Sequence, residues 1–168
     1  MKDNNPDNLS HFGSDRSAKK EINSFEDLLA WKIGFQLAKE VYEITSHFPA
    51  SERFGLTAQL RRSASSIPAN IAEGFGRHTF KEYLRFLVFA RGSVAETQSH
   101  LLLANAVGFL AKEELDRLLE LCLSSRKTIQ GLIRHLRNSM AHYNVSERAA
   151  EYGDDGAMTN DGSLPLNP

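Results

Sequence analysis

Apolar residues recur along the middle of this chain with the period of a helix. Between residues 24 and 140, apolar side chains return every three or four positions, as on one face of a helix. This spacing persists through four stretches, at about 24–47, 52–74, 80–107 and 112–140. The alternation at every second residue that marks a half-buried strand does not occur. The pattern therefore predicts four long helices.

Capping residues indicate where these helices begin. Ser24 followed by Asp27 predicts the start of the first helix, and Ser51 the start of the second. Thr79 followed by Glu82 forms a capping box for the third. With such short connections, neighbouring helices should be antiparallel. The expected fold is an all-α, up-down-up-down four-helix bundle.

Pro68 lies inside the second predicted helix. Proline lacks a backbone donor and its ring clashes with the carbonyl four residues back, here that of Ala64, so we expect a kink or local break. The nearby hydroxyls of Ser63, Ser65 and Ser66 are expected to bond backbone groups there.

The first and third helices carry more apolar surface than one stripe. In the first, Phe35 and Leu37 point about 200° apart, and both belong to sustained apolar series. In the third, Phe86 and Phe89 lie off the face built on Leu87. The second helix adds a strip of small residues, namely Ala58, Ser65, Ala69 and Ala72. These features predict self-association. The alternative is thicker packing within one chain, with a bent second helix covering both sides of the third.

The ends of the chain differ from the middle in composition and charge. The net charge of the whole chain is −1, but it is unevenly distributed. Residues 21–140 contain fifteen basic and thirteen acidic residues, whereas residues 141–168 contain one basic and five acidic residues. Both ends are poor in large apolar side chains, which favours disorder. We therefore predict a disordered arm at 1–22, a bundle at 23–140 and a disordered acidic tail at 141–168.

Positive charge is concentrated between residues 53 and 91. Only Glu73 and Glu82 oppose seven cations there. Six of these are candidate nucleic-acid contacts: Arg53, Arg61, Arg62, Arg77, Lys81 and Arg85. Such charge attracts polyanions by releasing counterions. The alternative is a solvated face with interhelical ion pairs. The seventh cation, Arg91, is expected to be partly buried and paired with Glu73 or Glu96.

No motif for catalysis, a metal or a cofactor is visible in the sequence. The lone Cys122 lies among leucines and is expected to be a core residue. Glu96 and His100 form a single pair, whereas a di-metal bundle needs paired Glu-x-x-His motifs. The N-terminus is polar and no apolar run approaches membrane-spanning length, so we expect a cytoplasmic protein without a cofactor and without membrane contact.

Two stretches resemble a known family. They are QLRRSASSIPANIAEG at 59–74, and YLRFL followed by ARGSVAE at 83–96, with FEDL and Trp31 near the start of the first helix. These residues are similar to the bacterial 23S rRNA intervening-sequence proteins, a family that includes the accessory variability determinant proteins of diversity-generating retroelements. The resemblance implies an antiparallel bundle assembled into a ring-like homopentamer. Relatives in retroelements look like nucleic-acid-binding partners of a reverse transcriptase, using basic surfaces, whereas relatives encoded inside rRNA intervening sequences have no settled activity.

The family signature maps onto individual positions of this chain. Arg61 and Arg62 match its paired arginines. The other matching positions are Pro68, Asn70, Glu73 and Gly74 in the second helix, and Arg91, Gly92, Ser93 and Glu96 in the third. We expect structural roles first for Asn70, Glu73, Arg91 and Glu96. The long arm and the acidic tail depart from the family pattern. The sequence thus favours a non-enzymatic, oligomeric nucleic-acid-binding accessory protein, with a protein-interaction scaffold as the alternative.

Overall fold

The computed structural model describes the backbone of residues 22–153 and the side chains of residues 22–141. Four α-helices make up this part: α1 (Leu29–Ile44), α2 (Leu56–Phe75), α3 (Phe80–Ala106) and α4 (Lys112–Gly153). Short 3-10 turns lie at Phe25–Asp27, Thr45–His47 and Ala50–Glu52. The described residues contain no strand, and the predicted all-α four-helix bundle is confirmed.

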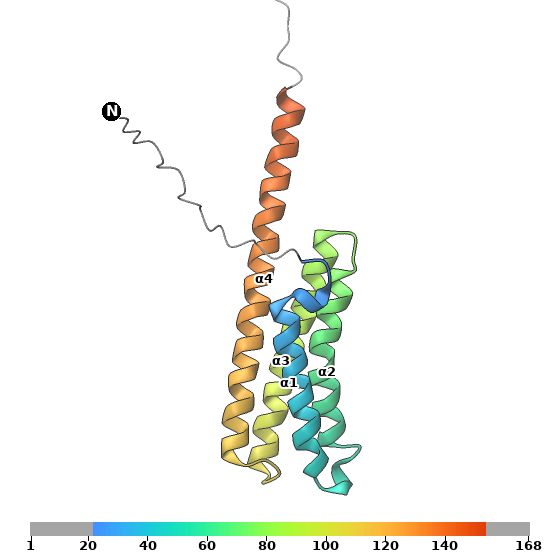
Figure 1. Cartoon of the computed structure of the whole chain (residues 1–168), viewed down its shortest axis with the longest axis vertical. Helices are drawn as coiled ribbons and strands as arrows, with labels where there is room; N and C mark the ends of the chain where they lie inside the picture. The colour runs from blue at the N-terminus through green and yellow to red at the C-terminus, as the bar shows by residue number, and fades with distance from the viewer. Residues whose placement is uncertain (1–21, 154–168) are drawn as a thin grey trace, which may run out of the picture.

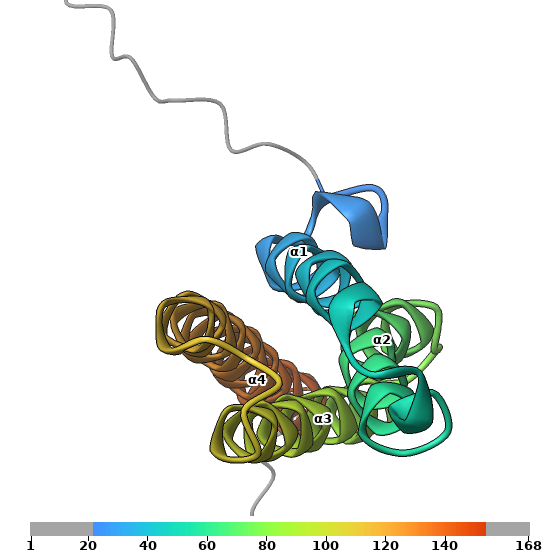
Figure 2. The same cartoon turned by 90° about the horizontal axis from the view of Figure 1, so that it is seen from below.

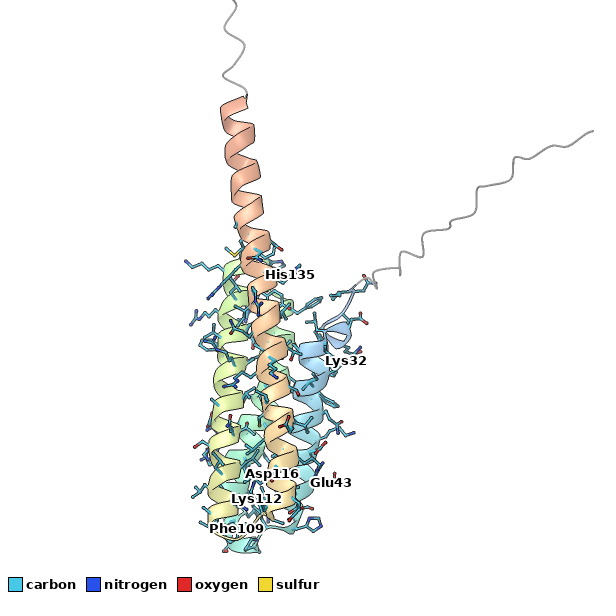
Figure 3. The ribbon with its side chains drawn as sticks, turned by 90° about the vertical axis from the view of Figure 1, so that its left-hand side faces the viewer. Lys32, Glu43, Phe109, Lys112, Asp116 and His135 are labelled. Atoms are coloured by element: carbon cyan, nitrogen blue, oxygen red, sulfur yellow. The ribbon has the colours of Figure 1, made fainter. Side chains whose placement is uncertain are left out.

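Successive helices run in opposite directions, and α4 extends well beyond the other three (Figure 1). Seen from one end, the helices occupy the corners of a square in chain order (Figure 2). Each therefore packs against two neighbours, and α4 closes the square against α1. Figure 3 looks onto α4, with α3 and α1 on its two sides.

The last helix is longer than expected. The helix α4 ends at Gly153, not near residue 140. Residues 141–152 contain no glycine or proline and include several good helix formers, so nothing in their composition stops the helix. Residues 141–153, predicted as part of a disordered tail, are therefore helical. The remainder of that tail, and residues 1–21 of the predicted arm, lie outside the described residues.

The first helix begins later than its capping box. Ser24 and Asp27 do form the expected reciprocal cap, but it closes the 3-10 turn Phe25–Asp27. Leu28 then adopts an extended conformation (φ −67°, ψ 124°), and α1 starts at Leu29. The side chain of Leu28 is buried in the core, which favours this conformation. The extended backbone of Leu28 separates the cap from the start of α1.

The second helix also begins later than predicted. Ser51 lies within the 3-10 turn Ala50–Glu52 and caps nothing. The Glu52 carboxylate instead accepts a hydrogen bond from the backbone N–H of Leu56, at 3.0 Å. A glutamate side chain can satisfy a first-turn donor and adds negative charge at the positive end of the helix. Glu52 thus takes the role predicted for Ser51.

Pro68 does not interrupt α2, which is continuous from Leu56 to Phe75. The side chain is buried against α1, where Gly34 leaves room for close approach. A Cβ added at Gly34 would lie 2.8 Å from Ile67 Cγ2. The Ser65 and Ser66 hydroxyls both donate to the carbonyl of Arg62, as expected for serines near the proline. The predicted local break is therefore absent, because packing against α1 supports the helix around the proline.

A single apolar core fills the centre of the square. Each helix contributes fully buried side chains, among them Leu37, Leu60, Ile67, Leu87, Leu101, Leu118 and Ile129. Cys122 belongs to this core, as predicted, and burial raises the pKa of its thiol from 9.0 to about 12. No described helix is both long enough and apolar enough to cross a bilayer.

Candidate nucleic-acid interface

The paired arginines of α2 are engaged within the bundle. Arg61 donates from Nε to the Thr45 hydroxyl at 2.8 Å, and its guanidinium lies 5.0 Å from the centre of the Tyr42 ring. Arg62 forms an ion pair with Glu96 at 2.6 Å. Arg61 thus ties α2 to the end of α1, and Arg62 ties α2 to α3.

Arg77 is also partnered. It forms an ion pair with Glu73 one turn earlier, and its guanidinium lies 4.8 Å from the centre of the Phe86 ring. Arg77 and Glu73 are partly exposed, and an exposed pair of this kind contributes only about 0–1 kcal/mol. The Glu73 carboxylate nevertheless offsets the positive charge that Arg77 presents to an anion.

The other three candidates are exposed and have no carboxylate partner among the described residues. They are Arg53, Lys81 and Arg85. Lys81 and Arg85 lie one turn apart at the start of α3. Arg53 lies before α2, at the other end of the bundle, about 30 Å away along that twenty-residue helix. The structure therefore brings Lys81 and Arg85 together and separates Arg53 from them.

The signature residues of α2 have clear packing roles. Gly74 faces α3 so closely that an added Cβ would lie 2.8 Å from Tyr83 Cδ2 and 2.9 Å from Phe86 Cβ. Asn70 donates to the carbonyl of Ser66 at 2.7 Å. Gly74 thus allows the close approach of α2 and α3, whereas the Asn70 bond lies within α2.

Among the signature residues of α3, Arg91 is placed differently from the prediction. Arg91 is exposed and donates to Gln130 on α4 at 2.9 Å, so neither expected glutamate is its partner. Glu73 and Glu96 are instead engaged by Arg77 and Arg62. The Ser93 carbonyl accepts a hydrogen bond from Thr97. Gly92 is exposed, and an added Cβ there would meet nothing within 4 Å.

The basic residues on α4 are not among the six predicted nucleic-acid contacts. Arg126, Lys127 and Arg134 line a hollow of about 360 Å³ together with Arg91 and Gln130. A signal was present in the sequence: residues 121–141 contain four Arg or Lys and no Asp or Glu. The segment 53–91 has the larger surplus of positive charge, and only the fold brings Arg91 of α3 beside the cations of α4.

An apolar groove lies between α1 and α2. Its volume is about 510 Å³, and Trp31, Phe35 and Tyr42 form its α1 side. The Trp31 and Phe35 rings are stacked with their centres 4.8 Å apart. The small residues of α2 form the other side: Ser65, Pro68, Ala69 and Ala72. Phe35 and Tyr42 remain 45% and 49% exposed in the single chain.

The outer side of α3 is apolar and uncovered as well. The exposed large apolar side chains of α3 are Phe80, Val88, Phe89, Leu102 and Leu103, and the Arg85 guanidinium lies 5.4 Å from the centre of the Phe89 ring. The helix α2 is unbroken and does not cover both sides of α3. The alternative in which a bent second helix covers the apolar surfaces of the third within one chain is therefore not what the structure shows.

The described residues offer little support for a metal site. They contain no group of three or more His, Cys, Asp or Glu that could hold a metal ion. His100 Nε2 lies 3.8 Å from a Glu96 oxygen that already pairs with Arg62.

The fold and its surfaces thus define a small four-helix bundle protein with an apolar groove and two basic regions. The family model of the 23S rRNA-intervening sequence protein matches residues 26–131. This chain belongs to that family, as its α2 and α3 signatures indicated.

A solved structure with the same fold comes from Bacteroides thetaiotaomicron and is described as a protein with unknown function from the S23 ribosomal protein family. The two match with a TM-score of 0.60 and 19% identity, over 65% of this chain and 98% of that one. At this identity the likeness concerns the fold alone. No curated protein matches this chain.

Proposed function

We propose that this protein is a non-enzymatic, cytoplasmic homo-oligomer that binds nucleic acid as an accessory protein. The single observation that carries self-association is the aromatic groove between α1 and α2, together with the uncovered apolar side of α3. Large exposed apolar surfaces on one chain usually mark an interface.

The occupant that we propose for the groove is the α3 face of a second copy. The groove and the α3 face are different surfaces of the same chain, so the contact between two copies would be head-to-tail. Head-to-tail contacts form a closed ring when the rotation from one copy to the next adds up to a full turn. The Ala69 and Ala72 side would let a neighbouring helix approach closely. A homopentamer, which the family resemblance implies, is the ring that we propose.

Nucleic-acid binding is supported by cations that have no carboxylate partner. Lys81 and Arg85 are exposed at the start of α3, next to Arg77 in the chain. Unpaired cations gain most from releasing the counterions of a polyanion. In a ring, each copy would contribute the same cluster, which strengthens binding to an extended strand.

A labelled RNA or DNA strand tests this proposal. We expect binding at low salt that weakens steeply as salt rises, and weaker binding by Lys81→Glu/Arg85→Glu. Arg61 and Arg62 are left intact because their loss would also disturb contacts within the bundle. The absence of binding at low salt would overturn the nucleic-acid proposal.

The alternative function is a protein-interaction scaffold, for which a reverse transcriptase is the kind of partner that the resemblance implies. The aromatic lining of the α1–α2 groove favours this alternative, since aromatic residues are enriched at protein interfaces. Isolation of one stoichiometric protein partner, insensitive to nuclease and lost when the groove is blocked, would support the scaffold over nucleic-acid binding.

A further inference from the structure

Four cations line the hollow between α3 and α4. Arg91 comes from α3, and Arg126, Lys127 and Arg134 come from α4. The two helices lie side by side in Figures 2 and 3. Arg126, Gln130 and Arg134 follow each other at intervals of four residues, so they form one stripe on α4.

No described carboxylate neutralises this group. None of its four cations takes part in an ion pair within residues 22–141. The nearest acidic residue along α4 is Glu120, before Arg126, and the nearest on α3 is Glu96, which is paired with Arg62. Arg91 is held by Gln130, a neutral partner that leaves its charge uncompensated. This hollow, called the α3–α4 groove from here on, therefore attracts anions.

The dimensions and donors of the groove suit a row of phosphates. Arg126 and Arg134 are separated by about 12 Å along the helix axis. One strand of a duplex presents a charge about every 3.4 Å, so about three phosphates span this length. Guanidinium groups match phosphate oxygens with paired donors.

An acidic peptide fits the groove less well. All five lining residues are cationic or amide side chains, and the apolar part of the lining consists of their aliphatic stems. No aromatic or branched aliphatic residue lines the groove to hold a side-chain anchor. Peptide sites usually depend on such anchors. We infer that the α3–α4 groove binds the sugar-phosphate backbone of a nucleic acid and contributes more to affinity than the corner at Lys81 and Arg85. This inference rests on the proposed nucleic-acid function and names the surface that carries it.

Two variants with equal charge loss test this assignment. The groove variant is Arg126→Gln/Lys127→Gln/Arg134→Gln, and the matched control is Arg53→Gln/Lys81→Gln/Arg85→Gln. All six residues are exposed and none has an ion-pair partner among the described residues. Unchanged melting temperatures and masses should show that both variants are folded and assembled.

The measurement is the affinity for a short labelled DNA duplex as a function of salt. Three lost phosphate contacts should lower the slope of log affinity against log salt by about 2.7, and the affinity by more than about 100-fold at about 0.1 M salt. We expect this for the groove variant and a smaller loss for the control. An equal or larger loss in the control would overturn the groove assignment while leaving the proposed function intact. If the wild type failed to bind at low salt, the proposed function would fail first, and the inference with it.

Discussion

Thr97 on α3 and Ser63 on α2 share a buried hydrogen bond, with 3.0 Å between the two hydroxyl oxygens. Both side chains are fully buried in an otherwise apolar layer. Residues 34 positions apart in sequence are thereby held opposite each other, which favours one register between the two helices.

Removing this hydrogen bond should weaken the bundle in a way that depends on both partners. Thr97→Val keeps the shape and should cost about 0.5–1.5 kcal/mol of unfolding free energy. Ser63→Ala should cost a similar amount, and the double variant less than the sum, because both single changes remove the same hydrogen bond. The remaining hydroxyl keeps a backbone acceptor in each single variant, the Leu60 carbonyl for Ser63 and the Ser93 carbonyl for Thr97. Urea unfolding of the four proteins measures this coupling. Strictly additive losses would show that the contact contributes nothing.

Two helical glycines should respond in opposite directions to alanine. Gly74→Ala would place a Cβ against Tyr83 and Phe86, and such overpacking typically costs about 1–3 kcal/mol. Gly131→Ala is the matched control, since an added Cβ there meets nothing within 4 Å. Alanine should stabilise that position by up to about 1 kcal/mol. Thermal unfolding of both variants checks this, and a Gly74→Ala protein as stable as the wild type would argue against the close approach of α2 and α3.

Tyr83 should make the protein sensitive to alkali. Burial raises its pKa from 10.0 to about 12, and its hydroxyl is buried without a hydrogen-bond partner. The pKa of Tyr83 in the folded protein lies above that in the unfolded chain, so deprotonation favours unfolding. The free energy of unfolding should therefore be unaffected by Tyr83 below pH 10 and should fall as the pH rises towards 12. Tyr83→Phe should be close to neutral or stabilising at pH 7 and should lose less stability between pH 10 and 12. Cys122 contributes in the same direction from about pH 9, so Tyr83→Phe is compared with the wild type at each pH.

A large charged side chain in the α1–α2 groove should block self-association. Ala69 is exposed on the α2 side of the groove, so Ala69→Arg should leave the fold intact while preventing a neighbouring helix from docking. Ala141→Arg is the control, because Ala141 is an exposed α4 residue outside the groove and the α3 face. Light scattering should show a lower mass for the first variant and an unchanged mass for the second. Identical masses would place the interface elsewhere.

The helices themselves were predictable because their apolar periodicity is strong. Their starts were less so. Ser24 forms the expected cap, but the buried Leu28 separates that cap from α1. Ser51 was the better capping residue by type, yet Glu52 reaches the first turn of α2. Both outcomes depend on tertiary packing and on side-chain reach, which local sequence does not specify.

The sequence predicted that the surface around α2 and α3 is positively charged. It did not predict which partner each arginine meets. Whether an arginine is free depends on which residue the next helix places opposite it. Arg62 meets Glu96, 34 residues later, and Arg91 meets Gln130, 39 residues later. A short stretch of sequence cannot show such pairs. The candidate nucleic-acid contacts therefore included Arg62 as well as Lys81, and did not include Arg126.

The mass of the purified, nuclease-treated protein tests the central claim, self-association, most directly. Light scattering at micromolar concentration should give an oligomer, and about 94 kDa if five copies of the 18.8 kDa chain form the ring. A different oligomer would change the proposed number of copies while keeping the self-association claim. A monomer of 18.8 kDa would contradict the claim that the apolar faces of α1, α2 and α3 are covered by further copies of the same chain.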